Sequence, residues 1–215
     1  TLLRELRMPI VTTLHTVLSR PEPDYKRCFD ELANISDRLV VMGHKALGIL
    51  KDRYKLPDAK ILYIPHGVPD LPFTDPNFYK DLFGVEGRKV ILTFGLLSPG
   101  KGIEHMIEAL PAVVKKHPDV VYVILGATHP HILRQSGQEY RFSLQRRVKA
   151  LGLTKHVMFQ DRFVEAEELH AFLGSADISV TPYLNEAQIT SGVLSFSLGC
   201  GKAVISTPYW HAVEA

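Results

Sequence analysis

The chain has 215 residues and a formal net charge of +2, with 46% hydrophobic and 22% charged residues. This balance is typical of an ordinary soluble globular protein of one large or two small domains, and it excludes a disordered or fibrous chain. The charge is too small to indicate nucleic acid as a partner, and the densest basic cluster, at residues 146–149, is best explained as a solvated helix face.

Short β-branched runs alternate with segments of helical period along the whole chain. Eight runs are predicted as strands, at residues 9–17, 38–42, 60–67, 89–95, 120–127, 156–161, 177–184 and 202–209. Apolar residues repeat with helical spacing at 103–110 and again at 144–151. Several strands are nearly continuous hydrophobic runs, as in a parallel sheet that is buried on both faces. The pattern predicts an α/β fold with open parallel sheets covered by helices.

Residues 69–88 interrupt this rhythm because they are rich in Pro, Asp and Gly. We expect residues 1–70 to be the C-terminal part of a first Rossmann-like domain and residues 71–88 to be a linker. Residues 89–215 would then form a second Rossmann-like domain, truncated at its end, where HAVEA begins a helix. The sequence is thus expected to be an incomplete piece of a larger two-domain protein.

Two cysteines, Cys28 and Cys200, form neither a disulfide framework nor a zinc-binding pattern, which favours a reducing compartment. No apolar run approaches the roughly 20 residues that cross a bilayer. No signal peptide is visible, and the chain begins without Met. We expect a cytoplasmic protein, with nothing that indicates contact with a membrane.

The stretch FGLLSPGKG at 94–102 joins a predicted strand to a predicted helix, an arrangement suited to an anion. Glycines allow a phosphate to approach the backbone, and Lys101 adds a full positive charge. The spacing from Gly95 to Lys101 is that of a P-loop, but Gly102 lacks the hydroxyl that would hold Mg²⁺, and Pro99 removes one N–H donor. A tight turn that binds nothing is the alternative.

The stretch GLLSPGKGIEHMIEALPAVVKKHPDVVYVILG, which begins at Gly95 in this loop, resembles the opening of the C-terminal domain of retaining GT-B glycosyltransferases of the group 1 family. The likeness continues through LGL at 151–153, TP at 181–182 and GKAV at 201–204, and TLHT and IPHGV resemble the end of the N-terminal domain. The resemblance implies a GT-B fold. It also implies transfer of a sugar, with retention of configuration, from a nucleotide-sugar to an unknown glycan, lipid or small-molecule acceptor. Neither a metal nor another cofactor is expected.

The resemblance assigns donor-binding roles to residues of the second domain. Gly95, Lys101 and Gly102 match the family's diphosphate loop, and Lys101 would stabilise the leaving diphosphate. The family's Arg falls at Leu96, and its two Glu residues fall at Gln188 and Phe196. Gln188 retains hydrogen-bonding capacity toward sugar hydroxyls, whereas Leu96 and Phe196 do not replace the charges.

Further candidates lie at another helix start and at two predicted strand ends. Residues 189–192 (Ile189, Thr190, Ser191 and Gly192) precede a helical pattern and offer backbone N–H groups to a phosphate, although ordinary capping is the alternative. His15 ends a predicted strand, and the resemblance implies that it contacts the donor sugar as a catalytic residue; a structural histidine at a strand end is the alternative. Arg162 and Phe163 match the region that contacts the nucleotide base, but Arg162 suits a surface position equally well.

Three functions are open at this stage. A glycosyltransferase is the leading hypothesis. A GT-B relative that uses phosphate differently, such as a phosphorylase or an epimerase, is a second. A non-catalytic sugar- or nucleotide-binding module is the third, because charged residues of the family are replaced at Leu96 and Phe196.

Overall fold

The computed structural model describes residues 5, 8–70 and 72–215. The chain divides into two compact units. The first unit contains Thr1–Gly67, Glu186–Ser191 and Pro208–Ala215, and the second contains Val68–Asn185 and Gly192–Thr207. The second unit therefore begins near the expected boundary, but the chain returns to the first unit twice.

The first unit is built on a parallel sheet with the strand order β1-β2-β3. Its elements are β1 (Val11–Leu14), α2 (Pro23–Ile35), β2 (Arg38–Val41), α3 (His44–Asp52), the 3₁₀ turn Asp58–Lys60, β3 (Ile61–Tyr63) and α10 (Trp210–Glu214). The three strands that the sequence predicts here are confirmed. Helix α10 confirms the predicted helix start in HAVEA.

Two returning segments, 186–191 and 208–215, differ from the expected division, which placed them in the second domain. Ile189 is buried in the core of the first unit together with Leu39 and Leu50, and Trp210 packs against the same core. The sequence did not show this because short apolar segments do not reveal which core they join.

The second unit contains a five-stranded parallel sheet with the order β6-β5-β4-β7-β8. Its strands are β4 (Lys89–Phe94), β5 (Val120–Leu125), β6 (Val157–Gln160), β7 (Ile178–Thr181) and β8 (Ala203–Ser206), and all five confirm predicted strands. Its helices are α4 (Asn77–Lys80), α5 (Ile103–Lys116), α6 (Pro130–Ser136), α7 (Glu139–Ala150), α8 (Ala166–Ser175) and α9 (Gly192–Gly199), with 3₁₀ turns at Asp81–Phe83 and Pro99–Lys101. Chain order reverses between β4 and β7, and ligands of open α/β sheets bind at such a switch point.

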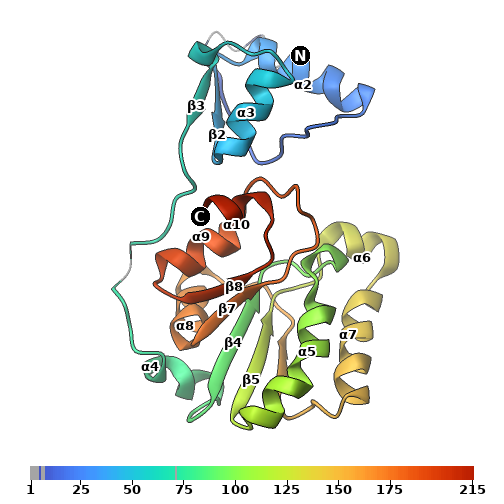
Figure 1. Cartoon of the computed structure of the whole chain (residues 1–215), viewed down its shortest axis with the longest axis vertical. Helices are drawn as coiled ribbons and strands as arrows, with labels where there is room; N and C mark the ends of the chain where they lie inside the picture. The colour runs from blue at the N-terminus through green and yellow to red at the C-terminus, as the bar shows by residue number, and fades with distance from the viewer. Residues whose placement is uncertain (1–4, 6–7, 71) are drawn as a thin grey trace. The chain divides into compact units, whose positions relative to one another are not determined.

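Helices cover both faces of this sheet, as the continuous apolar strands predict (Figure 1). On one face, α5 and α7 pack on Ile91, Tyr122 and Ile124. On the other, Phe172 and Leu173 of α8 pack with the alternate strand residues. All six residues of β5 are buried, which explains its lack of polar alternation. The α/β class with parallel sheets is confirmed.

The expected linker at 71–88 contains more structure than its composition indicates. Helix α4 and the following 3₁₀ turn lie within it, and Lys80 is 3% exposed and pairs with Asp177 at 2.9 Å. The ring of Tyr79 lies so close to Gly174 that a Cβ there would be 2.4 Å from it. This segment packs as part of the second unit rather than as a free connection.

No helix in the described residues has both the length and the apolar character needed to cross a membrane.

Candidate functional site

The carboxyl edge of the second sheet is shaped by two glycines with positive φ, Gly95 (107°) and Gly126 (144°). A Cβ on Gly126 would lie 2.1 Å from the carbonyl oxygen of Gly95, so only glycine permits this close approach. The N–H of Gly95 donates to Leu125 at 3.0 Å, and that of Gly126 donates to Gln160 at 2.9 Å. These bonds extend the sheet past the ends of its strands.

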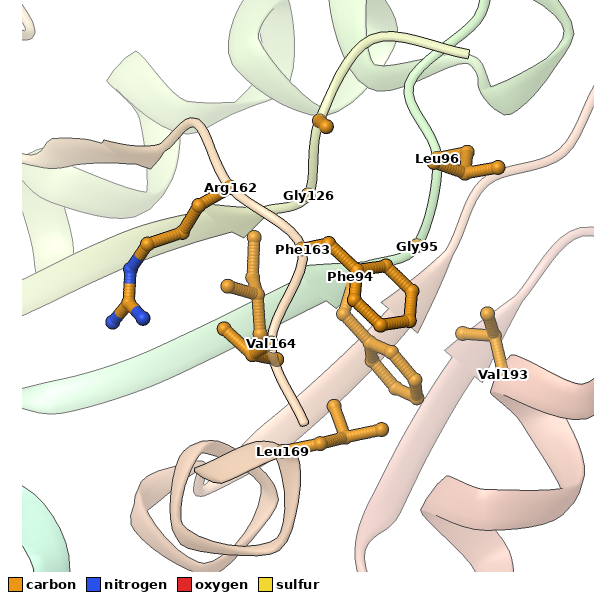
Figure 2. A pocket seen from close by; sticks show the side chains of 11 residues that line it. Phe94, Gly95, Leu96, Gly126, Arg162, Phe163, Val164, Leu169 and Val193 are labelled. Carbon is orange, nitrogen blue, oxygen red and sulfur yellow. The ribbon is translucent and has the colours of Figure 1, made fainter. Parts of the chain in front are cut away.

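An apolar pocket of about 230 Å³ opens at this edge. Phe94, Gly95 and Leu96 line it from the end of β4, Phe163 from the loop after β6, and Val193 from α9. Phe163 is 75% exposed, and Figure 2 shows its ring extending over the pocket toward Gly95 and Val193. A large exposed aromatic ring beside glycine backbone provides a surface for a flat, partly apolar ligand.

Arg162 also borders the apolar pocket, but its side chain turns away from Phe163 (Figure 2). Its Nη1 donates to Oε2 of Glu168 at 2.6 Å, and this bond lowers the pKa of the Glu168 carboxyl. The guanidinium of Arg162 therefore lies at the surface, as the alternative interpretation of the sequence predicted, whereas its backbone lies at the apolar pocket.

Lys101 lies in the 3₁₀ turn between β4 and α5. Its Nζ is 3.9 Å from the ring centroid of Tyr183, a residue that follows β7. Burial lowers the pKa of Lys101 to about 8. Among the described residues, no ion pair engages this ammonium group. A partly desolvated cation without a carboxylate partner is suited to an anionic ligand.

Gly102 explains why this loop carries no P-loop hydroxyl. The residue has φ 63°, and a Cβ would lie 2.0 Å from the carbonyl oxygen of Pro182. Serine or threonine would clash with the backbone after β7, so the close packing of two loops excludes a side chain here.

Four predicted donor-binding residues, at 188–191, belong to the first unit. The Nε2 of Gln188 donates to the carbonyl of Thr190 at 3.1 Å, and the N–H of Ser191 donates to Nδ1 of His211 at 2.8 Å. Ile189 is 5% exposed, so its side chain is a core residue and only its backbone remains for a ligand.

His211 and Thr190 further define the backbone around residue 190. Burial lowers the pKa of His211, which favours the neutral ring that accepts at Nδ1. The Oγ1 of Thr190 contacts Sδ of Met42 at 3.9 Å. The predicted phosphate-binding N–H of Ser191 therefore already has a histidine partner.

The structure divides the remaining candidates between the units. Helix α9 begins at Gly192 in the second unit, which confirms the predicted helix start. His15 is exposed in the first unit, directly after β1, as expected for a strand end. The second unit thus brings together Gly95 and Phe163 at the apolar pocket, with Lys101 in the loop that leaves β4.

Arg141 is an important residue that sequence reasoning missed. It is 1% exposed, and its Nη2 donates to the carbonyl of Gly126 and to Oδ1 of Asp161, each at 2.6 Å. Its Nε and Nη1 have no hydrogen-bond partner in the described structure. Arg141 therefore ties together two loops that border the apolar pocket. Its position three residues before Leu144, on the apolar face of α7, was the signal that could have revealed it.

The comparisons with known proteins agree with this architecture. Residues 76–213 match the family model of glycosyl transferases group 1. The chain belongs to this family.

Curated relatives of this group 1 chain include two mannosyltransferases of Mycolicibacterium smegmatis. The GDP-mannose-dependent alpha-(1-6)-phosphatidylinositol monomannoside mannosyltransferase is 32% identical over 130 residues, covering 59% of this chain and 31% of that protein. The phosphatidyl-myo-inositol mannosyltransferase is 26% identical over 209 residues, covering 93% of this chain and 47% of that protein. The chain spans less than half the length of these relatives.

Among solved structures, the Anabaena protein HepE in complex with UDP and glucose matches with a TM-score of 0.73 at 20% identity. The match covers 97% of this chain and 55% of HepE. The likeness supports the GT-B fold.

Two residues of this group 1 chain depart from the family pattern, and the structure shows where each of them lies. Leu96, at the position of the expected Arg, lines the apolar pocket and is 36% exposed. Phe196, at the position of the expected second Glu, is partly buried against the core that contains Phe172. Both replacements substitute apolar packing for a charge. Within the described residues, no group of three or more His, Cys, Asp or Glu side chains could hold a metal ion.

Proposed function

We propose that the protein is a glycosyltransferase that transfers a hexose from a nucleotide-sugar, with retention of configuration and without a metal ion. Membership of the group 1 family supports the reaction class. The observation that carries the proposal is the combination, in the second unit, of the apolar pocket with the ammonium of Lys101, which forms no ion pair among the described residues. A nucleotide-sugar offers an aromatic base and a diphosphate, which match these two features.

In this proposal the apolar pocket takes the nucleobase, with Phe163 against one face of the ring. Gly95 and Gly126 line this pocket without contributing a side chain, and the missing Cβ of Gly126 lets the two backbones pack together at the sheet edge. The ammonium of Lys101 lies beside the diphosphate and stabilises the charge that develops on it as the bond to the sugar breaks. In a metal-independent reaction this is the main electrostatic contribution from the second unit.

The residues of the first unit take the roles that the resemblance gave them. Gln188 orients sugar hydroxyls through its amide, and His15 contacts the donor sugar. The side chain of Gln188 already donates a hydrogen bond to the Thr190 carbonyl, so its orientation is fixed before a substrate binds. Its carboxamide oxygen is the atom left to accept a hydrogen bond from the sugar.

The acceptor that we propose is a polyol or sugar that carries a phosphate group. The two curated relatives bear names that include phosphatidylinositol or phosphatidyl-myo-inositol. An acceptor of this class presents hydroxyl groups for transfer next to a fixed negative charge.

The test measures binding first and transfer second. Calorimetry with UDP, GDP, UDP-glucose and GDP-mannose should detect saturable binding of at least one nucleotide pair, and Lys101→Met should weaken it. Release of the same nucleotide from its sugar donor, with an α-linked product from an α-linked donor, would establish retaining transfer. A protein that binds none of these compounds contradicts the proposal.

A non-catalytic nucleotide-binding function is the second candidate, because Leu96 and Phe196 replace charges of the family with apolar contacts. This function predicts the same binding without release of nucleotide from any sugar donor. The variant Leu96→Arg, which restores the charge, distinguishes this function from a glycosyltransferase. If the parent releases no nucleotide from a sugar donor and Leu96→Arg does, the result supports a non-catalytic function for the parent.

A further inference from the structure

Two opposite charges at the start of α5 do not pair with each other. Lys101 lies in the 3₁₀ turn before α5, and Glu104 lies in the first turn of the helix. Both residues are half-buried, and no ion pair among the described residues includes either of them. Three residues of chain span at most about 11 Å, a distance that a lysine and a glutamate side chain can bridge together. Since charges that are partly removed from water attract each other more strongly than in water, their separation needs a structural cause.

Tyr140 of α7 provides this cause on the side of the carboxylate. Its hydroxyl donates to Oε2 of Glu104 at 2.8 Å, and its ring packs against the core that α5 and α7 share. Burial, and then the bond to Glu104, raise the pKa of Tyr140, so the hydroxyl stays protonated and remains a donor. Burial also raises the pKa of Tyr122, and the charge of Glu104 adds to this effect. The carboxylate therefore lies beside neutral phenols rather than beside a cation.

Tyr183 provides the contact for the ammonium group. The Nζ of Lys101 lies 3.9 Å from the centroid of this ring, which follows β7 in the chain. Burial lowers the pKa of Lys101 to about 8, whereas a carboxylate beside it would raise that pKa. Two further ionisable groups at the start of α5, His105 and Glu108, contact each other at 3.5 Å. Lys101 and Glu104 thus each contact an aromatic residue instead of each other.

The start of α7 gives Tyr140 a fixed position. Gln138, at the N-cap of α7, accepts a hydrogen bond from the hydroxyl of Thr128 at 2.5 Å. Arg141, the residue after Tyr140, donates to a carbonyl just after β5 at 2.6 Å. Figure 1 shows α5 and α7 beside each other, and both pack on the same face of the sheet. Loss of the Tyr140 hydroxyl would leave these other bonds in place and release the carboxylate of Glu104.

We propose that Tyr140 is a positioning residue of the nucleotide site: its hydroxyl holds the Glu104 carboxylate away from Lys101 and so leaves the ammonium free for an anionic ligand. This inference rests on the proposed function, in which that ligand is the diphosphate of a nucleotide-sugar. Without the hydroxyl, Glu104 pairs with Lys101 and competes with the diphosphate for its charge. Tyr140 acts through Glu104 rather than on the ligand.

The first test follows the titration of Lys101 by NMR, with ¹³C-labelled lysine and with the signal assigned by its loss in Lys101→Met. In Tyr140→Phe we expect the titration midpoint to rise by about one pH unit, because the released carboxylate favours the charged lysine. Glu104→Asp should raise it as well, because the shorter side chain no longer reaches the hydroxyl while the ring of Tyr140 stays in place. An unchanged midpoint in either folded variant overturns the proposal.

Three further variants show whether the effect passes through the carboxylate. Glu104→Gln removes the charge and should change the midpoint of Lys101 little. The double variant of Tyr140→Phe with Glu104→Gln should return to the midpoint of the parent. Tyr25→Phe, which removes the hydroxyl of a half-buried tyrosine of the first unit, is the matched control and should leave the midpoint unchanged. A midpoint that stays raised in the double variant contradicts the proposed role of Glu104.

The second test is calorimetric titration at pH 7 with UDP and with inorganic diphosphate. Tyr140→Phe should weaken the binding of both about 10-fold, because Glu104 then competes for Lys101. The double variant should bind both as the parent does, and Tyr25→Phe should do the same. A loss of affinity that Glu104→Gln does not restore would give Tyr140 a purely structural role and overturns the proposal.

The two tests separate this inference from the proposed function. If the parent binds no nucleotide but the midpoint of Lys101 rises as expected in Tyr140→Phe, the proposed function fails and the positioning of Glu104 by Tyr140 stands. If nucleotide binds and neither the midpoint nor the affinity changes in Tyr140→Phe, the proposed function stands and this inference alone fails.

Discussion

The ammonium nitrogen of Lys101 lies 3.9 Å from the ring centroid of Tyr183, and the two residues follow β4 and β7, the neighbouring strands at which chain order reverses. The ring holds the cation without neutralising it, as a carboxylate would. A charge kept in this state at the switch point remains available to a ligand.

This relationship predicts the pH dependence of nucleotide binding. Burial lowers the pKa of Lys101 to about 8, so the ammonium is charged below that pH and loses its charge as the pH rises through it. A bound diphosphate favours the charged form. We therefore expect affinity for a nucleoside diphosphate to fall above pH 8, and binding at pH 8 to take up protons, seen calorimetrically as a heat that depends on the buffer.

Lys101→Met should remove this pH dependence and weaken binding about 10- to 100-fold at pH 7, the range of one charge-assisted hydrogen bond. We expect its Tm at pH 7 to be no lower than that of the parent, because the parent folds with a desolvated charge. Lys115→Met, an exposed lysine at the end of α5, is the control. A variant that keeps the pH dependence would assign it to another group.

Gly102→Ser tests whether the loop can accept the hydroxyl of a P-loop. The serine would adopt a left-handed conformation, and its Cβ would meet the Pro182 carbonyl at 2.0 Å. We expect a loss of at least about 2 kcal/mol in the free energy of unfolding, with no binding of Mg²⁺. Gly100→Ser is the matched control, since a Cβ there meets nothing within 4 Å and should change stability little. Similar stability of both variants would refute the packing argument.

The pair Arg141 and Asp161 should respond unequally to neutralisation. Arg141 is 1% exposed, whereas the Asp161 side chain is 46% exposed. Asp161→Asn leaves a buried guanidinium without its carboxylate and should cost more, about 1–3 kcal/mol, than Arg141→Met, which leaves a carboxylate that water can solvate. Chemical denaturation of the two single variants and the double variant measures the difference, and a larger loss in Arg141→Met would contradict it.

Much of the fold follows from local sequence. Strand β5 is predictable because its six consecutive apolar residues suit a strand that is buried on both faces, and β4 is predictable from the apolar run Val90–Leu92. Helix α5 is predictable because Ile103, Ile107 and Leu110 share one face. The short helix α4 was not predictable, because its burial depends on the ion pair between Lys80 and Asp177, a residue that is distant in the sequence.

In the candidate site, the local sequence pattern drew attention to residues of the loop between β4 and α5. Gly95, Gly102 and Lys101 stand out in a strand–loop–helix pattern. Tyr183 did not, since its contact with Lys101 depends on the order of strands in the sheet.

Phe163 gives a direct test of the apolar pocket. The side chain is 75% exposed, so Phe163→Ala should leave Tm within about 1 °C of the parent. Loss of a ring that stacks on a nucleobase should weaken nucleotide binding about 10-fold, and the loss should be greater for UDP or GDP than for inorganic diphosphate, which has no base. Phe142→Ala is the matched control, because Phe142 is 49% exposed on α7 and does not line the pocket. Equal affinity of Phe163→Ala and Phe142→Ala for the nucleotide would show that the base binds elsewhere.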